Sequence, residues 1–444
     1  MSYPQVLNFL NSLPNYEKNT NYSYSETIKL KRIQDFLALI GNPQKSLRVI
    51  HIAGTKGKGS TCAFVAYILR EAGFAVGLYT SPHLNDFRER IRILRPDGLK
   101  DKKIIKDFEG MIPKVDLKNI VIKLKPIISK YNSSSEYGPL SFFEVYTAIA
   151  FVYFFHRQVD FVVLETGMGG RLDATNTVNS WVCGITPISL EHTQKLGKTL
   201  NKIAQEKAGI IKPEVSIVIS AAQKPVAAKV IRLKCKKSQA KLLEVGRDLR
   251  YFKIKTSFLI QGLRDNYKNL KSSLIGEHQM ANATLAVGLV ETLKLYGFEI
   301  KASIIRQGVL KTIWPGRCEV VGKNPLIVLD GAQNLASAQI LKTAIKDNFK
   351  YNKLILVLGI SDDKDIAGIC KTLEPLAHKI ILTRAKSARA TYPKKLSAYF
   401  KQKVYLTASV KEAKLLAKSL AGKKDLILVT GSLFVVGEYR DVKK

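Results

Sequence analysis

The chain has 444 residues, 46% hydrophobic and 24% charged, with a formal net charge of +35; this length allows two or three domains, each with its own core. The longest apolar run, residues 145–155, is too short to span a bilayer, and the N-terminus shows no signal-peptide pattern. Five scattered cysteines without a CxxC pair argue against zinc sites and disulfides. We therefore expect a cytoplasmic protein that binds no membrane. The positive charge attracts anions such as ATP or nucleic acid, but the lysines are dispersed and no nucleic-acid-binding motif accompanies them, which favours solvated lysine-rich faces and no nucleic-acid partner.

The most informative segment is residues 47–60, with the sequence L-R-V-I-H-I-A-G-T-K-G-K-G-S. Its β-branched run, 49–53, predicts a buried parallel strand, and the spacing of apolar residues after Ser60 predicts a helix. A glycine loop between a strand and a helix N-terminus is an anion site, because its amide N–H groups and the helix dipole both attract negative charge. Lys58 can then reach the β- and γ-phosphates of ATP, and Ser60 or Thr61 can offer a hydroxyl to Mg²⁺. The alternative is a glycine-rich turn without a ligand.

Further along the chain, strand-like runs alternate with helical patterns, which predicts a mostly parallel, doubly wound α/β sheet. Residues 246–276 instead predict a small antiparallel patch. The expected strands are 161–165, 182–188 and 216–220 in the first part of the chain, and 326–330, 354–359, 379–383 and 426–430 in the second. We therefore expect a phosphate-loop domain over residues 1–308 and a Rossmann-like α/β domain over 309–444, joined near 305–311.

Polar residues follow several of the expected strands, where ligands of such sheets bind. Glu165 ends an otherwise apolar strand and is either a metal ligand or a cap for the next loop. A lone histidine such as His192 is more often structural. Lys207, in the last turn of the helical stretch 199–208, reads by itself as a surface lysine that suits the helix dipole.

Several segments resemble, in the same order, the motifs of folylpolyglutamate and dihydrofolate synthases within the Mur ligase superfamily. They are A-G-T-K-G-K-G-S at 53–60, Y-T-S-P-H-L at 79–84, L-E-T-G-M-G-G-R-L-D-A-T-N at 164–176, E-K-A-G-I-I-K at 206–212, G-E-H-Q at 276–279, W-P-G-R at 314–317 and T-G-S-L-F at 430–434. The resemblance implies an ATP-dependent ligase that adds L-glutamate to tetrahydrofolate, and also to dihydropteroate, through an acyl phosphate.

The resemblance also implies an ATP site. Its residues are Gly54, Thr55, Lys56, Gly57, Lys58, Gly59, Ser60 and Thr61 of the loop, Gln279 and Asn282 at the adenine side, and Arg317, Asp330 and Gln333 from the second domain. ATP would then bind between the two domains. The family pattern at 330–334 is D-G-A-H-N, whereas this chain has Gln333 in place of the histidine. Glutamine forms hydrogen bonds like a neutral imidazole but does not titrate.

For metal and catalysis, the resemblance implies a pair of Mg²⁺ ions, with K⁺ as a further cation. The implied metal ligands are Ser60, Ser81, Glu165 and His192, and the implied catalytic residues are Lys58, His192 and Lys207. In the family the lysine matching Lys207 is N-carbamylated by CO₂, which requires a neutral amine and hence a buried lysine. Glu191 stands where the family usually has aspartate.

The implied pterin site comprises Ser141, Phe143, Asp173 and Ala174. The carboxylate of Asp173 would accept the 2-amino and ring N–H groups, and Phe143 would stack on the ring. The alternatives are a turn aspartate and a core phenylalanine. The R-L-D-A-T-N wording favours an enzyme that also acts on dihydropteroate.

Three alternatives to this assignment remain. They are a Mur-type cell-wall amino-acid ligase, a basic nucleic-acid-dependent P-loop ATPase, and a protein that binds the ligands without catalysing the reaction, which Gln333 suggests. The expected partners are ATP, L-glutamate and either dihydropteroate or tetrahydrofolate, with the chain acting as a monomer.

Overall fold

The computed structural model describes residues 1–17, 22–96 and 108–441 and divides into two compact units. The first comprises Met1–His83, Phe87–Ser272 and Met280–Thr312, and the second Leu84–Asp86, Ser273–Gln279 and Ile313–Lys444.

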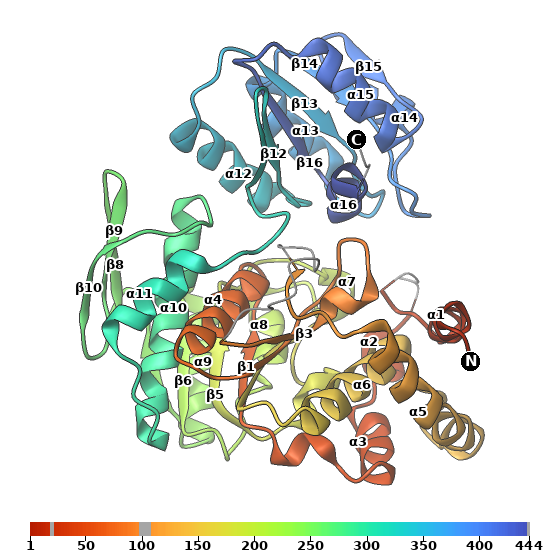
Figure 1. Cartoon of the computed structure of the whole chain (residues 1–444), viewed down its shortest axis with the longest axis vertical. Coiled ribbons are helices and arrows are strands. Elements are labelled where there is room, and N and C mark those ends of the chain that lie inside the picture. Colours follow the sequence, from red (N-terminus) through yellow and green to blue (C-terminus); the bar gives the residue numbers. More distant parts are fainter. Residues whose placement is uncertain (18–21, 97–107, 442–444) are drawn as a thin grey trace. The chain divides into compact units, whose positions relative to one another are not determined.

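The first unit consists of helices around one large and one small sheet (Figure 1). Its helices are α1 (Tyr3–Ser12), α2 (Tyr24–Thr27), α3 (Leu30–Leu39), α4 (Lys58–Glu71), α5 (Lys114–Ser134), α6 (Phe142–His156), α7 (Thr193–Leu196), α8 (Leu200–Ala208), α9 (Pro225–Lys237), α10 (Glu277–Glu291, whose first turn groups with the second unit) and α11 (Ala302–Lys311). Its strands are β1 (Val49–Ala53), β2 (Val76–Tyr79), β3 (Ile91–Leu94), β4 (Phe161–Glu165), β5 (Ser180–Ile185), β6 (Ile217–Ser220), β7 (Lys241–Glu244), β8 (Arg250–Ile254), β9 (Ser257–Gln261) and β10 (Asn266–Leu270). Short 3₁₀ helices are η1 (Pro43–Ser46), η2 (Phe87–Arg90), η4 (Ala174–Thr177) and η5 (Thr292–Tyr296).

Within the described residues, the large sheet has seven strands in the order β3-β2-β4-β1-β5-β6-β7. Strands β2 and β3 are antiparallel, and the other neighbouring pairs are parallel. Because β1 lies between β4 and β5, the segments that follow these three strands meet at one edge of the sheet.

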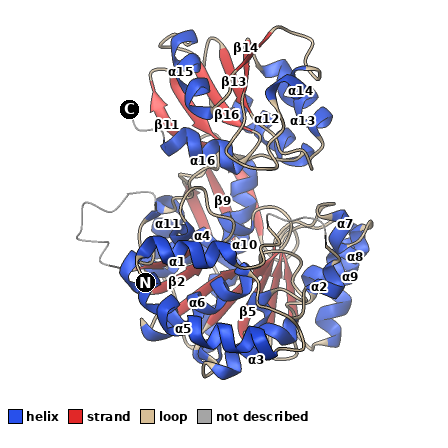
Figure 2. Ribbon diagram, turned by 90° about the vertical axis from the view of Figure 1, so that its right-hand side faces the viewer, coloured by secondary structure: helices blue, strands red, loops and turns tan. Residues whose placement is uncertain are grey.

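Helices cover both faces of this sheet (Figure 2). A Cβ added at Gly77 of β2 would touch Phe154 of α6, and one added at Gly184 of β5 would touch Leu289 of α10. The strand register places Gly77 on the face of His51 and Gly184 on the face of Ile52. Helix α6 therefore packs on the His51 face and α10 on the opposite one. All five residues of β1 are buried, as a central strand covered on both faces requires.

The small sheet is the antiparallel meander β8-β9-β10. The carboxylate of Glu291 in α10 connects it to the rest of the unit by accepting hydrogen bonds from Leu263 N (2.8 Å), Arg264 N (3.2 Å) and the Tyr267 hydroxyl (2.9 Å). These contacts fix the C-terminal end of the helix that carries Asn282.

The second unit has a sheet in the order β11-β12-β16-β13-β14-β15, in which β11 and β12 are antiparallel and the other neighbouring pairs are parallel. Its strands are β11 (Glu319–Lys323), β12 (Leu326–Leu329), β13 (Leu354–Leu358), β14 (Lys379–Leu382), β15 (Val404–Leu406) and β16 (Leu426–Thr430). Its helices are α12 (Leu335–Asn348), α13 (Ile366–Leu373), the 3₁₀ helix η6 (Glu374–Leu376), α14 (Pro393–Ser397), α15 (Val410–Leu420) and α16 (Leu433–Asp441).

The predicted fold class is confirmed: a mostly parallel doubly wound sheet with a small antiparallel patch, followed by a second α/β unit. Strands that the sequence analysis did not identify are β2, β3, β7, β11 and β15, which have three to five residues each. The expected domain limits stay a prediction; residues 305–311 lie within α11, and the compact units divide after Thr312. None of the helices in the described part of the chain combines the length and apolar character that crossing a membrane requires.

Candidate active site

The phosphate loop connects β1 to α4, and two of its glycines fit where no other residue does. Gly54 has a φ of +145°, and an added Cβ would lie 1.9 Å from Thr186 Oγ1. Gly57 is the N-cap of α4 with a φ of +83°, and its Cβ would lie 2.3 Å from Asn282 Oδ1. The loop therefore packs against the segment after β5 on one side and against α10 on the other. This places the predicted residue Asn282 beside the loop.

Replacement of Gly54 by alanine is expected to abolish nucleotide binding and to lower the free energy of unfolding by about 3 kcal/mol, since a strained backbone and a steric clash combine. The matched control is Gly41→Ala, where φ is +85° and an added Cβ meets no atom within 4 Å. That variant carries only the backbone cost of about 1–2 kcal/mol and keeps parental affinity. Calorimetric titration with ADP and urea unfolding measure both quantities; parental ADP affinity in Gly54→Ala would contradict the assignment of the loop.

Backbone and hydroxyl groups after β5 hold the loop in place. Thr55 N and Lys56 N both donate to Pro187 O, at 3.0 and 3.2 Å. The Thr55 hydroxyl donates to Ser189 O at 3.2 Å and accepts from Ser189 N at 3.1 Å. The sequence analysis missed Pro187, because this contact depends on β5 lying next to β1, which no local pattern reveals.

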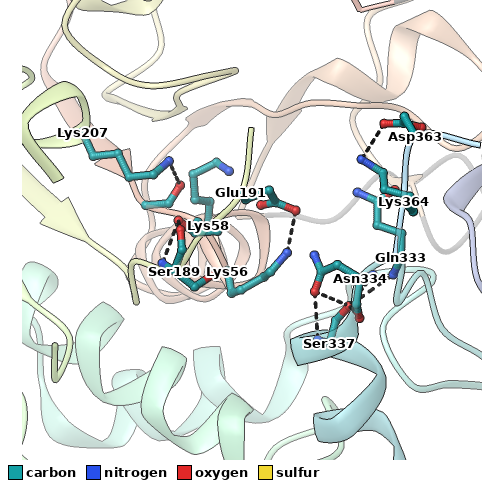
Figure 3. A network of polar contacts seen from close by, with 12 residues as sticks. Lys56, Lys58, Ser189, Glu191, Lys207, Gln333, Asn334, Ser337, Asp363 and Lys364 are labelled. Carbon is teal, nitrogen blue, oxygen red and sulfur yellow. Dashed lines mark hydrogen bonds and ion pairs between the residues drawn. The ribbon is translucent and has the colours of Figure 1, made fainter. Parts of the chain in front are cut away.

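Two lysines of the loop segment lie near carboxylates, and Figure 3 shows one of these pairs, Lys56 with Glu191. Lys58 Nζ lies 3.8 Å from Glu165 Oε1, and Glu165 Oε2 accepts a hydrogen bond from Ser81 N at 3.1 Å. Lys56 Nζ lies 2.7 Å from Glu191 Oε1. Burial raises the pKa of Glu191, but the positive charges of Lys56 and His192 outweigh it and lower that pKa to about 2. Glu191 is therefore an anion throughout the neutral range.

The remaining loop residues and His192 lie close along the chain to these pairs. Gly59 and Ser60 are in the first turn of α4, where Ser60 is buried, and the buried Thr61 hydroxyl has no hydrogen-bond partner. His192 adopts a left-handed backbone with a φ of +52° and forms the N-cap of α7. Of the predicted metal ligands, the structure brings Ser81 and Glu165 into direct contact.

Lys207 is buried, with only 4% of its surface exposed, and its Nζ donates a 2.7 Å hydrogen bond to Gly54 O (Figure 3). Burial, and next the positive charge of Lys58, lower the pKa of Lys207 to about 7. A sizeable fraction of the amine is therefore neutral at neutral pH. The close packing of Gly170 against the backbone oxygens of Glu206 and Lys207 explains the burial of this last turn of α8.

The donor set suits a hard cation that keeps several water or phosphate ligands. Glu165 offers carboxylate oxygens beside the loop, and the hydroxyls of Ser60, Thr61 and Ser81 are neutral oxygen donors. Among the described residues no group of three or more His, Cys, Asp and Glu side chains could hold a metal alone. Mg²⁺ fits such a site because phosphate oxygens of a bound nucleotide would complete its coordination.

The predicted pterin residues lie on two adjoining segments of the His51 face. Ser141 caps α6, with its hydroxyl donating to Glu144 Oε2 at 2.6 Å and accepting from Glu144 N at 3.3 Å. The S-F-F-E spacing at 141–144 is the capping-box pattern that signals such a cap. A Cβ added at Gly167 would lie 2.6 Å from the Phe143 ring, so the loop after β4 passes beside that ring.

Asp173 is the N-cap of η4, and Ala174 is the buried first residue of that helix. Burial raises the pKa of Asp173. Its Oδ1 accepts from Thr175 N (3.0 Å) and the Thr175 hydroxyl (2.6 Å), and its Oδ2 accepts from Met168 N (2.9 Å). The backbone N–H of Gly167 also interacts with this carboxylate, so the fold itself occupies most of its roughly four acceptor positions. A bidentate contact with a pterin would therefore have to replace one of these hydrogen bonds.

In the second unit, the predicted residues gather after β12. Asp330 accepts hydrogen bonds from Cys318 N and Ala332 N, both at 2.8 Å, and its buried position raises its pKa. A Cβ added at Gly331 would lie 2.6 Å from Arg317 Nη1, so the guanidinium packs against this turn. Gln333 N donates to Ser337 Oγ at 3.1 Å, at the start of α12 (Figure 3).

One further predicted residue lies at the start of α10. Gln279 is buried in the first turn of α10. In the second unit, Asp363 forms an ion pair with Lys364 at 2.9 Å (Figure 3), and both residues follow β13. Arg389, which follows β14, lies 3.8 Å from the same carboxylate.

Comparisons with known proteins show which family the chain resembles. Residues 128–290 match the Mur ligase middle domain, and residues 316–433 match the Mur ligase, glutamate ligase domain. The chain is 35% identical over 421 residues to a dihydrofolate synthase/folylpolyglutamate synthase from Bacillus subtilis, covering 93% of this chain and 94% of that protein.

The chain belongs to the folylpolyglutamate synthase and dihydrofolate synthase family. The solved folylpolyglutamate synthase of Mycobacterium tuberculosis, complexed with ADP and AMPPCP, superposes with a TM-score of 0.86 at 30% identity and covers 99% of this chain and 97% of its own. Escherichia coli FolC in complex with DHPP and ADP superposes with a TM-score of 0.85 at 28% identity, covering 100% of this chain and 97% of its own. The family expected from the motifs is confirmed, while the individual site assignments stay predictions.

Proposed function

We propose that this protein is an ATP-dependent ligase that joins the amine of L-glutamate to the carboxylate of a folate. The observation that carries the proposal is the phosphate loop of a folylpolyglutamate synthase fold, with Lys58, Glu165 and a buried Lys207 gathered around it. Relatives named for both activities, such as the Bacillus subtilis protein, support tetrahydrofolate and dihydropteroate as alternative acceptors.

The reaction requires that the substrate carboxylate be activated. Its oxygen attacks the γ-phosphorus of ATP, the bond to the β,γ-bridging oxygen breaks, and ADP leaves. The amine of glutamate then attacks the acyl carbon, phosphate departs and the amine proton is lost to solvent. The loop N–H groups and Lys58 bind the phosphates and neutralise charge on the transferring group. Arg317 and Asp330 are proposed as further nucleotide contacts.

Mg²⁺ neutralises phosphate charge when bound, and Ser60, Ser81, Glu165 and His192 are the residues proposed to hold it. A carbamate on Lys207 would add an anionic oxygen beside Gly54 O. K⁺ is proposed as an additional cation. The pterin is proposed to lie along Ser141, Phe143, Asp173 and Ala174. A monomeric state and a cytoplasmic location remain predictions from the sequence.

A product mass assay tests this function. Purified protein receives Mg-ATP, glutamate and either dihydropteroate or tetrahydrofolate, with parallel reactions containing K⁺ or Na⁺. We expect products heavier by one glutamyl residue, together with ADP and phosphate. ATP turnover that ignores both acceptors and requires nucleic acid, or ligation of a muropeptide instead, would refute the proposal.

Replacement of Gln333 by histidine is expected to leave kcat equal to or above that of the parent, because it restores the residue of the family pattern. The backbone N–H of Gln333 donates to Ser337 Oγ in the first turn of α12, and this bond does not involve the Gln333 side chain, so the substitution should leave the fold intact. Steady-state kinetics and thermal unfolding measure the outcome. A fall in kcat of more than about tenfold, which corresponds to 1.4 kcal/mol, would show that glutamine is the better residue in this chain.

A further inference from the structure

A buried hydrogen-bond chain connects the centre of β1 to the carboxylate of Asp173. His51 Nε2 lies 2.8 Å from Thr175 Oγ1, and Thr175 Oγ1 lies 2.6 Å from Asp173 Oδ1. His51 and Thr175 have no exposed surface, and Asp173 is 5% exposed. The three groups are thus isolated from solvent. In the protein interior, hydrogen bonds are stronger than in water and restrict the side chains more.

The direction of the protons follows from the chemistry of the two ends. Asp173 accepts from the backbone N–H groups of Thr175 and Met168, so its oxygens are acceptors and the Thr175 hydroxyl donates to Oδ1. The lone pair of that hydroxyl must then accept from His51, whose Nε2 carries the proton. Burial lowers the pKa of His51 to about 3, and its Nδ1 has no hydrogen-bond partner, which fits the neutral Nε2–H tautomer because that tautomer places no proton on Nδ1.

This hydrogen-bond chain holds one oxygen of Asp173 in place. Oδ1 accepts two hydrogen bonds, both from Thr175, and Oδ2 accepts one from Met168 N, while the backbone N–H of Gly167 also interacts with the carboxylate. The orientation of the carboxylate is therefore fixed from both of its sides. His51 lies three residues before Gly54 on β1, so the strand that leads into the phosphate loop also fixes the orientation of this carboxylate.

We propose that His51 and Thr175 are positioning residues that hold Oδ1 of Asp173 and so fix the orientation in which this carboxylate meets an N–H donor of the substrate's pterin ring. The inference rests on the proposed function, because it assigns the loop after β4 to the pterin of that same reaction. His51 and Thr175 act through Asp173 and do not touch substrate.

Matched variants separate this role from simple support of the fold. Thr175→Val removes the hydroxyl at nearly constant volume, and Thr175→Ser keeps it. Thr177→Val makes the same chemical change two residues later, where the hydroxyl donates only to Ala174 O within the same turn. His51→Leu removes the donor, and His51→Gln keeps an N–H donor at the same number of bonds from the backbone.

Steady-state kinetics with dihydropteroate and direct binding of AMPPCP provide the main measurement. Thr175→Val and His51→Leu are each expected to raise KM for dihydropteroate about tenfold or more, as loss of a supporting hydrogen bond typically does, while AMPPCP affinity and kcat stay near parental values. Thr175→Ser, His51→Gln and Thr177→Val should stay near the parental KM. The double variant His51→Leu/Thr175→Val should be no worse than Thr175→Val, because the two residues act in series.

A spectroscopic measurement tests the chain without substrate. In protein labelled with ¹⁵N-histidine, the His51 signal is identified as the one that is missing in His51→Leu. This signal should show a neutral Nε2–H tautomer that persists to pH 5, and its chemical shift should change in Thr175→Val. An Nδ1–H tautomer would overturn the inference, as would a Thr175→Val variant with parental KM. A variant in which kcat, AMPPCP affinity and Tm all fall while KM rises, and which Thr175→Ser does not rescue, would show a merely structural role. If the parent turns over neither dihydropteroate nor tetrahydrofolate, the proposed function fails and this inference with it, whereas an active parent isolates the inference.

Discussion

Replacement of Lys207 by alanine is expected to reduce ligase activity by about 100- to 1,000-fold, the range found when a charge-stabilising group is removed from an active site. The amine lies 2.7 Å from Gly54 O in the phosphate loop, and its pKa is lowered to about 7 by burial and by Lys58. A neutral amine can attack CO₂, forming an N–C bond and releasing a proton, which leaves a carbamate anion. Short carboxylic acids such as acetate should restore part of the activity in Lys207→Ala by supplying the missing oxygens.

The pH dependence of this step has a definite sign. Below pH 7 the amine is mostly protonated and does not attack CO₂, and above pH 7 it is mostly neutral. At fixed dissolved CO₂, activity should therefore rise with pH through the neutral range, and removal of CO₂ should lower it reversibly. With ¹³C-bicarbonate, a carbamate NMR signal should appear in the parent and in the control Lys202→Ala, an exposed lysine of the same helix, but not in Lys207→Ala. Activity of Lys207→Ala within threefold of the parent would rule out the carbamate.

Replacement of Lys58 by alanine is expected to lower kcat by a few hundred-fold, since removal of one donor aimed at developing charge typically costs about 3–4 kcal/mol. Lys58 begins α4 and lies 3.8 Å from Glu165 Oε1. Without its charge, the pKa of Lys207 should rise, because Lys58 is one of the groups that lower it. The pH–activity profile of Lys58→Ala should consequently shift to higher pH as well as fall in amplitude.

Single-turnover assays across pH measure both effects. Lys236→Ala, an exposed lysine of α9, is the control for loss of one positive charge from a strongly basic protein and should match the parent. A Lys58→Ala variant with kcat within threefold of the parent would show that this loop does not bind the transferring phosphate.

The sequence predicts the local parts of this site well, because their signals lie within a few residues of one another. The run of β1, the glycines of the loop and the start of α4 follow each other directly, and each has its own physical signature. Strand β4 and its terminal Glu165 also have a clear local pattern in the sequence. By contrast, β2 has only four residues including Gly77, and β15 has three partly exposed residues, so neither forms a distinct pattern.

Long-range contacts account for what the sequence did not predict. The role of Pro187 depends on β5 lying beside β1, and the burial of Lys207 depends on the loop at Gly170 packing against the last turn of α8. The hydrogen-bond chain from His51 through Thr175 to Asp173 joins residues more than a hundred positions apart in the sequence, and no local pattern indicates it. Several of these residues lie in motifs that resemble those of the family, but the motifs do not say why each residue is needed. The packing of the folded protein gives that reason.

The order of strands in the large sheet also bears on how the protein matures during synthesis. Strand β1 emerges early, yet its neighbours β4 and β5 are encoded more than a hundred residues later. Until β5 has emerged and paired, Thr55 N and Lys56 N lack the carbonyl of Pro187 that receives them. A nascent chain therefore carries the complete phosphate-binding motif long before it can hold that motif in shape. Such distant pairing is slow to form, so nucleotide can stabilise only the later stages of folding.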